Sequence, residues 1–131
     1  MLLAVIDLST GRTSIVQAGH PHPVLQRADG RQENLGQGGL PVGLIPYAPF
    51  DAFDCQLLPG DSLIILSDGV SECTAPDDRM LGTEGLAVML DQLRDMTGTS
   101  FLEAVMWYLS DYAGGRDFPD DISGILFEYS G

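Results

Sequence analysis

Two acidic sites, far apart in the chain, stand beside hydrophobic runs. The first is Asp68, which follows the apolar run 62–67 and precedes Gly69. The second is the pair Asp120 and Asp121, which opens the last hydrophobic run. A carboxylate at the end of a buried strand lies at the mouth of a core, where ligands and metals are usually bound. Since Mg²⁺ and Mn²⁺ prefer oxygen ligands, two such sites match what a hard divalent cation needs.

The elements that must position these acids follow from periodicity and turn residues. The order predicts an α+β fold, in which two helices cover one face of a largely antiparallel sheet. Because only two helices are predicted beside six or seven strands, the other face of the sheet would be left uncovered. The predicted strands are 2–8, 13–17, 24–27, 52–58, 62–67 and 122–129, and the predicted helices are 84–96 and 101–112.

Turn and helix signals set the boundaries of these elements. Turns are predicted at 9–12 and at 28–31, each of which contains a glycine. The stretch 36–44 is predicted to be a loop because it is rich in glycine. It lacks the Lys-Ser/Thr of a phosphate-binding loop and no helix follows it, so a plain loop is favoured over a phosphate site. Thr83 is the expected N-cap of the first helix. Apolar residues at helical spacing form one stripe on each helix; they are Leu86, Leu90 and Leu93, then Leu102, Val105, Met106 and Leu109.

Length and composition limit the class of protein. A chain of 131 residues with 44% hydrophobic residues is expected to form a single domain over 1–131. Six basic residues against 19 acidic ones give a net charge of −13, which argues against nucleic acid and anionic membrane surfaces as partners. No apolar stretch is long enough to cross a bilayer, and the opening residues do not read as a signal peptide. Cys55 and Cys73 are expected to be free thiols, and the chain to be cytoplasmic.

Six segments, in this order and spacing, resemble the carboxyl-terminal half of one family. That family is the metal-dependent serine/threonine protein phosphatases of type 2C, in the bacterial branch typified by stage II sporulation protein E. The segments are 17–23, 39–44, 58–61, 66–72, 81–86 and 120–123. The resemblance implies a truncated form of a four-layer α-β-β-α fold. It also implies a role in bacterial signal transduction, with a phosphorylated protein such as an anti-sigma-factor antagonist as substrate and an upstream sensor or receiver domain as regulator.

The resemblance also assigns roles to particular residues. Asp68 matches the metal aspartate of an Asp-Gly motif, and Asp120 matches that of the closing acidic motif, with Asp121 beside it. Two Mg²⁺ or Mn²⁺ ions are implied for the intact enzyme. Gly69 would allow a close backbone approach, and His20 and Glu72 are candidates for supporting the site, although Glu72 is more readily explained as a solvated side chain.

One departure from the family pattern matters. The family has an earlier aspartate, in a Gly-Asp-x-x-Gly-His-Gly motif, that bridges both metals, and this sequence has no such motif. Asp7 looks like a polar residue before a hairpin turn instead. The sequence is therefore expected to be a partial phosphatase domain that lacks its amino-terminal part. Such a fragment would bind metal weakly or not at all, would be inactive alone, and would self-associate through its amino-terminal strands.

Other interpretations stay open beside this one. Asp68 alone suits a turn, since Asp-Gly is a common turn pair, and Asp120 and Asp121 suit a charged cap. The missing motif favours a non-catalytic docking or regulatory module as the alternative to an enzyme, and an unrelated acidic β-rich binding domain is a third option. His20 and His22 are more readily explained as part of a rigid corner of the chain than as ligands of a zinc site. Cys73 is not expected to be a nucleophile, and Trp107 is expected to pack in or near the core.

Overall fold

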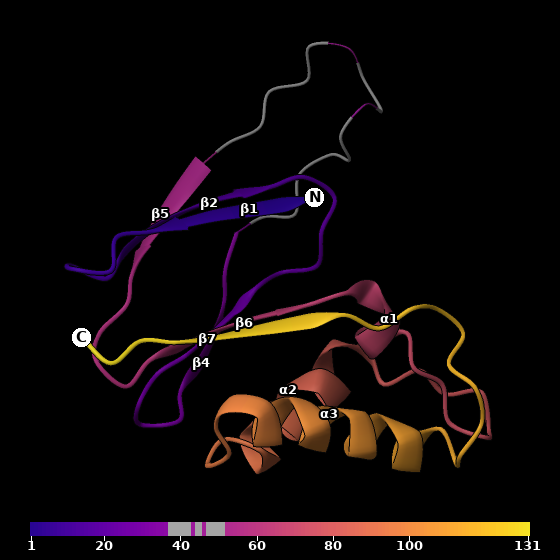
Figure 1. Ribbon diagram of the computed structural model, residues 1–131. Coiled ribbons are helices and arrows are strands. Elements are labelled where there is room, and N and C mark those ends of the chain that lie inside the picture. Colours follow the sequence, from indigo (N-terminus) through magenta and orange to yellow (C-terminus); the bar gives the residue numbers. More distant parts are fainter. Residues whose placement is uncertain (37–42, 44–45, 47–51) are drawn as a thin grey trace. The chain divides into compact units, whose positions relative to one another are not determined.

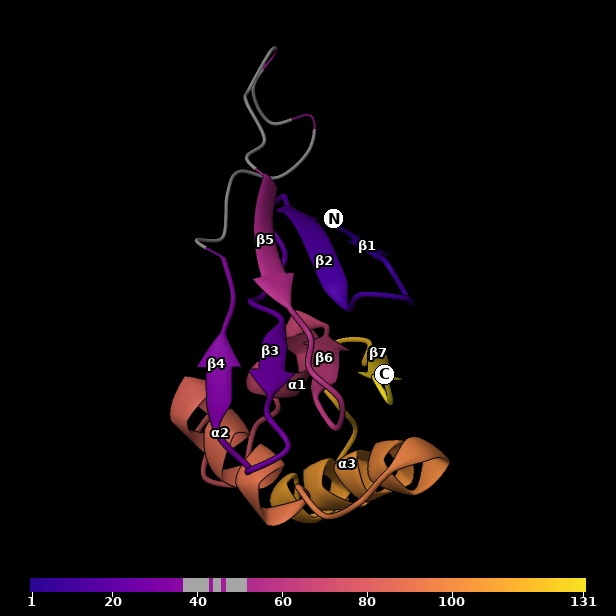
Figure 2. The same cartoon turned by 90° about the vertical axis from the view of Figure 1, so that its left-hand side faces the viewer.

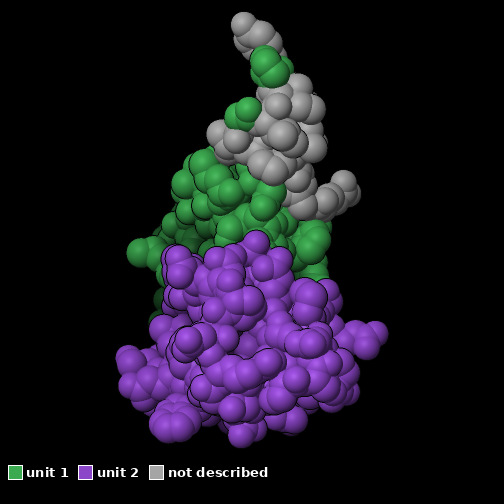
Figure 3. Space-filling model, turned by 90° about the vertical axis from the view of Figure 1, so that its right-hand side faces the viewer, with its two compact units in different colours: residues 1–65, 127–131 green, residues 66–126 purple. Residues whose placement is uncertain are grey.

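The computed structural model describes residues 1–36, 43, 46 and 52–131. Most of the glycine-rich stretch predicted to be a loop at 36–44 lies outside the described residues. The chain forms two compact units: Met1–Ile65 with Phe127–Gly131, and Leu66–Leu126 (Figure 3). The division passes through two strands, β6 (Ser62–Leu66) and β7 (Gly124–Glu128). The single-domain expectation stays a prediction.

The first unit contains an antiparallel sheet of three strands in the order β1-β2-β5 (Figure 1). These are β1 (Leu2–Ile6), β2 (Arg12–Gln17) and β5 (Ala52–Gln56). The β1–β2 turn needs Gly11, whose φ is 76°. Asp7 begins this turn, and its Oδ1 accepts hydrogen bonds from the Ser9 hydroxyl (2.6 Å) and backbone N–H (2.9 Å), which lower the pKa of Asp7. The predicted place of Asp7, before a hairpin turn, is confirmed.

A second sheet has four strands in the order β4-β3-β6-β7 (Figure 2). Strands β3 (Val24–Gln26) and β4 (Gln32–Asn34) form a hairpin, and β3 also pairs with β6 in the antiparallel sense. Leu63 and Ile64 of β6 are each 1% exposed, as expected of a central strand. Strand β4 was not predicted, because its sequence Gln-Glu-Asn carries no apolar alternation.

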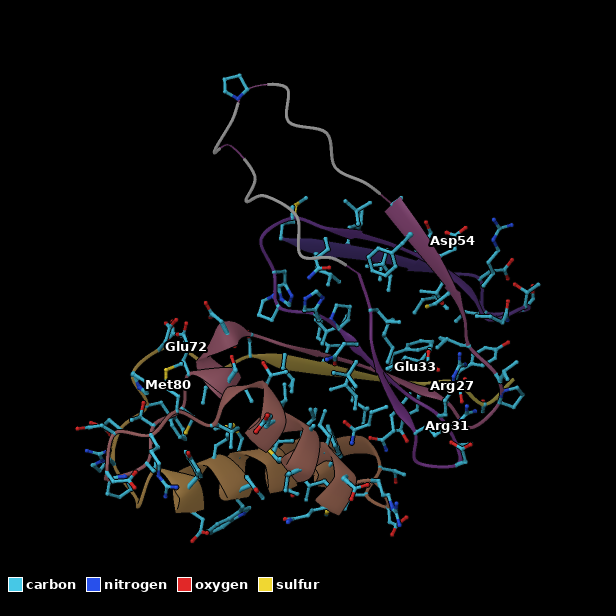
Figure 4. All side chains as sticks on the ribbon, turned by 180° about the vertical axis from the view of Figure 1, so that it is seen from behind. Arg27, Arg31, Glu33, Asp54, Glu72 and Met80 are labelled. Carbon is cyan, nitrogen blue, oxygen red and sulfur yellow. The ribbon has the colours of Figure 1, made fainter. Side chains whose placement is uncertain are left out.

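The buried acid Asp61 joins several segments of the first unit. Its side chain is 2% exposed and its Oδ2 lies 2.6 Å from a guanidinium nitrogen of Arg27. The same carboxylate accepts hydrogen bonds from the backbone N–H groups of Ala28 (3.1 Å) and Leu58 (2.8 Å). Arg27 also faces Glu33 across the β3–β4 hairpin at 3.5 Å (Figure 4). The buried charge is therefore fully paired, which raises the pKa of Arg27.

The second unit contains the three helices α1 (Asp68–Ser71), α2 (Gly82–Gln92) and α3 (Gly98–Tyr112). Helix α2 buries Met89 and Leu90. Helix α3 buries Phe101, Val105 and Leu109, which recur every four residues along one face. The described residues therefore form an α+β fold with two antiparallel sheets and few helices, and the predicted fold class is confirmed.

Several boundaries and faces differ from the prediction. Helix α2 begins at Gly82, not after Thr83, since the N–H of Gly85 already bonds to the carbonyl of Leu81 at 3.2 Å. Helix α3 begins at Gly98, because the N–H of Phe101 bonds to the carbonyl of Thr97 at 3.3 Å. No helix in the described part of the chain is long and apolar enough to cross a membrane.

The expected packing of Trp107 in or near the core was wrong. Trp107 is 78% exposed and Met106 is 42% exposed. The apolar residues of this helix form two stripes, and only the stripe that contains Phe101 is packed inside. An apolar pattern with two stripes gives no indication of which one faces the core.

Candidate metal site

Hydrogen bonds between Ser67 and Ser123 bring the two acidic segments of the second unit together. The N–H of Ser67 donates to the carbonyl of Ser123 at 2.9 Å. The N–H of Ser123 donates back to the Ser67 hydroxyl oxygen at 2.9 Å. Ser67 immediately precedes Asp68, and Ser123 follows the Asp120–Asp121 pair. These contacts therefore hold the start of α1 beside the segment that leads into β7.

Gly69 allows this approach at close range. A Cβ atom built on Gly69 would lie 2.2 Å from the carbonyl oxygen of Asp121 and 3.3 Å from Cγ1 of Ile122. No side chain fits there, since the nearest obstacle is backbone. The close backbone approach expected at Gly69 is present, and its partner is the backbone of Asp121.

Three carboxylates meet as a result. Oxygen atoms of Asp68, Glu72 and Asp120 all lie within 4.8 Å of one another. Asp68 opens α1 and Glu72 caps its carboxyl end, so one helical turn places both on the same side. Figure 4 shows Glu72 projecting from the end of this helix. Asp68 and Asp120 are exposed and Glu72 is half-buried, which leaves the group open to solvent.

The arginine side chains have partners outside this group of three carboxylates. Six residues are arginine or lysine, and all six are described arginines. Five pair with other acids: Arg12 with Asp54, Arg27 with Asp61, Arg31 with Asp29, Arg79 with Asp77 and Arg94 with Asp91. The sixth, Arg116, donates to the carbonyl of Ala75 at 2.5 Å. Within the described residues, no arginine forms an ion pair with the three carboxylates.

The donor set fits a hard divalent cation. It consists of carboxylate oxygens alone, which Mg²⁺ and Mn²⁺ favour over the nitrogen and sulfur ligands that suit zinc. Three negative groups at this spacing repel one another, and a divalent cation bound between them would attract all three and offset that repulsion. Asp68, Glu72 and Asp120 are the residues that would hold it.

Two other candidates lie outside this cluster. The side chain of Asp121 is not among the three grouped carboxylates, and its backbone carbonyl accepts a hydrogen bond from the Ser67 hydroxyl at 3.4 Å. His20 belongs to the other unit, where its Nδ1 lies 2.8 Å from the carbonyl oxygen of Pro21. His22 Nδ1 likewise lies 2.9 Å from the carbonyl oxygen of Leu35. The ligand role of Asp121 and the supporting role of His20 stay predictions.

Sequence reasoning underrated two residues of the site. Glu72 stands four positions after Asp68, a helical spacing that signals a shared face once α1 is recognised. The sequence pattern predicts Ser67 only as the end of a strand, although a hydroxyl before a strand-end acid can form hydrogen bonds to a neighbouring segment. Because α1 is only four residues long, the sequence indicates neither the shared helical face of Asp68 and Glu72 nor the hydrogen-bonding role of Ser67.

The two cysteines are expected to react slowly. Cys73 is buried and Cys55 is partly buried, and burial raises the pKa of both thiols. At neutral pH we expect little iodoacetamide labelling of the folded chain, least at Cys73, and rapid labelling in denaturant, as measured by mass spectrometry. The contribution of the two protonated thiols to the stability of the fold is complete below the ordinary thiol pKa. It is lost as the pH rises through the raised pKa of the folded state. Fast labelling of Cys73 under native conditions would contradict its burial.

Comparison with known proteins gives the family. The family model described as stage II sporulation protein E (SpoIIE) matches residues 1–130. The chain belongs to this family. The resemblance expected from the ordered motifs is confirmed, and the SpoIIE family is one of protein phosphatases of the PP2C type.

Solved structures show the same fold. The phosphatase domain of the cell fate determinant SpoIIE from Bacillus subtilis, presoaked with Mn, matches 100% of the chain with a TM-score of 0.79 and 21% identity. The SiaA-PP2C domain of Pseudomonas aeruginosa matches 98% of the chain with a TM-score of 0.85 and 18% identity. The chain covers 56% and 50% of these two domains, so it matches part of the PP2C fold.

A relative in sequence is much longer than this chain. Protein IcfG of Synechocystis sp. (strain ATCC 27184 / PCC 6803 / Kazusa) is 28% identical over 125 residues. The match covers 95% of the chain and 20% of IcfG. The SpoIIE-family chain thus spans about half of the solved domains and a fifth of this relative.

Proposed function

We propose that this chain supplies the carboxyl-terminal metal-binding half of a metal-dependent protein serine/threonine phosphatase in bacterial signal transduction. The observation that carries the proposal is the meeting of Asp68, Glu72 and Asp120 within 4.8 Å in a member of the SpoIIE family. The bridging aspartate expected in such enzymes would come from the part of a complete domain that this chain does not span. The activity is therefore proposed for the complete domain, not for this chain alone.

The chain's own residues have distinct tasks in this proposal. Divalent cations, when bound, lower the pKa of water and neutralise phosphate charge. Asp68 and Asp120 supply the oxygen ligands from two distant segments, and Glu72 adds a third carboxylate. Gly69 and Ser67 keep the two segments in contact, which sets the spacing of the carboxylates.

The first test is phosphatase turnover with Mn²⁺ by the complete natural domain on a phosphoserine peptide. Asp68→Asn is expected to lower turnover by about two orders of magnitude or more, because an amide is a weaker ligand than a carboxylate. Asp95→Asn, which changes an exposed acid outside the cluster, is the matched control and should keep normal turnover. Full turnover by the Asp68→Asn enzyme would remove this residue from the mechanism.

The missing motif supports a second candidate function. A phosphatase-like domain without the bridging aspartate would serve as a non-catalytic docking or regulatory module. The two candidates differ in the coding sequence upstream of Met1: a Gly-Asp-x-x-Gly-His-Gly segment there favours the enzyme, and its absence favours the module. The phosphoprotein substrate, the sensor or receiver domain, the cytoplasmic location and self-association remain predictions.

A further inference from the structure

Helix α3 carries a second stripe of residues opposite the one it buries. Glu103, Met106, Trp107 and Ser110 follow the i, i+3, i+4, i+7 spacing that places side chains on one helical face. Trp107 is 78% exposed, the highest value among the exposed large apolar side chains in the described part of the chain. Met106 beside it is 42% exposed. A large apolar pair on an outer face is typical of an interaction surface.

A loop turns this face into a groove. Gly114 and Gly115 end α3 with φ values of 66° and 78°, conformations that reverse the chain and favour glycine. The following residues then line a hollow of about 520 Å³ together with Glu103, Met106, Trp107 and Ser110. The hydrogen bond from Arg116 to the carbonyl of Ala75 holds this loop in place.

The charge around the groove is acidic. Glu103 and Asp117 line it, and α3 contains no arginine or lysine. Arg116 also lines the groove, but its guanidinium already donates to Ala75. An incoming segment therefore meets apolar side chains flanked by two carboxylates. That combination complements a basic amphipathic segment and disfavours a second copy of a chain whose net charge is −13.

We propose that this groove on α3, defined by Met106, Trp107 and Phe118 with Glu103 and Asp117 at its edges, binds a basic amphipathic peptide segment of another protein. An apolar side chain of the partner lies against Trp107 and Met106, and its lysines or arginines pair with the two carboxylates. The proposal does not depend on metal binding, since none of these residues belongs to the acidic cluster.

The chain's single tryptophan reports on the groove directly. The free chain should show the red-shifted fluorescence of a water-exposed indole. Titration with a synthetic amphipathic helical peptide of leucine and lysine should shift the emission to the blue and should weaken as salt is added. A peptide with glutamate in place of lysine, and one with the leucines and lysines scrambled, should produce no shift.

Variants locate the binding. Met106→Gln keeps the reporter and is expected to weaken peptide binding about tenfold, as loss of an interface anchor does. Val88→Gln, on α2 and 51% exposed, is the matched control and should bind normally. The double variant Glu103→Gln, Asp117→Asn should bind several-fold more weakly and lose most of the salt dependence.

Four results would overturn the proposal. These are a blue-shifted emission in the free chain, equal binding of the acidic peptide, unchanged binding by the Met106→Gln variant, and an emission that shifts with protein concentration alone. The last result would indicate that a second copy occupies the groove. Mn²⁺ binding by the acidic cluster is measured separately, so failure here leaves the proposed function untouched.

Discussion

Replacing Gly69 with alanine should destabilise the fold and disperse the acidic cluster. The new methyl group would lie 2.2 Å from the Asp121 carbonyl oxygen, and backbone cannot move aside as the end of a side chain can. We expect a loss of about 3 kcal/mol in the free energy of unfolding, at the upper end for overpacking. The start of α1 and the Asp120–Asp121 segment must then separate, so Mn²⁺ affinity should fall together with stability.

Denaturant unfolding and Mn²⁺ titration, both on the complete domain that contains this chain, check this prediction. Gly85→Ala is the matched control, because the Cβ there meets the side chain of Leu81, with its nearest atom at 2.8 Å, and lies within a helix. Alanine is favoured over glycine in helices, so the control should lose little stability. Equal effects of the two substitutions on stability and on Mn²⁺ affinity would show that the Gly69 contact does not set the geometry of the site.

Removing Asp61 should be as costly in the other unit. Asp61→Ala leaves Arg27 without its buried partner and leaves the N–H groups of Ala28 and Leu58 without their acceptor. Loss of one member of a buried ion pair costs about 3–5 kcal/mol, and we expect the lower end of that range because Arg27 keeps Glu33 at 3.5 Å. We expect a correspondingly large fall in the midpoint of denaturant unfolding.

The control for this experiment is another acid paired with an arginine. Asp54→Ala removes a pair with Arg12 in which both side chains are largely exposed, at 52% and 73%. Exposed pairs contribute about 0–1 kcal/mol, so this variant should unfold almost like the parent. An Asp61→Ala protein that matches the Asp54→Ala protein in stability would contradict the importance of burial at Asp61.

The sequence was enough to predict the strands that carry apolar runs and the acid that follows one of them. β6 and Asp68 are clear because five apolar or small residues precede a single charged one. The helices were found from their periodicity, but their first residues were placed two or three positions late. Helix starts depend on backbone hydrogen bonds such as Gly85 to Leu81, and no side-chain cap marks them here.

What the sequence did not predict depends on contacts between distant segments. Glu72 enters the cluster only because α1 forms and because the Asp120 segment lies beside it. Trp107 was expected to be packed, because packing in or near the core is the default for a tryptophan on a helix. Which of the two stripes faces inward is set by the packing of the unit, and periodicity alone cannot report that choice.

The order of strands in the four-stranded sheet has a consequence for biosynthesis. β6 can pair with β3 once both have left the ribosome, but its other edge has no partner until β7, which follows only after all three helices. During that interval a central, apolar strand exposes unpaired backbone groups to other chains. Asp68 and Asp120 come from segments 52 residues apart, so we expect the cation site to be completed late in folding, when the segment before β7 reaches α1.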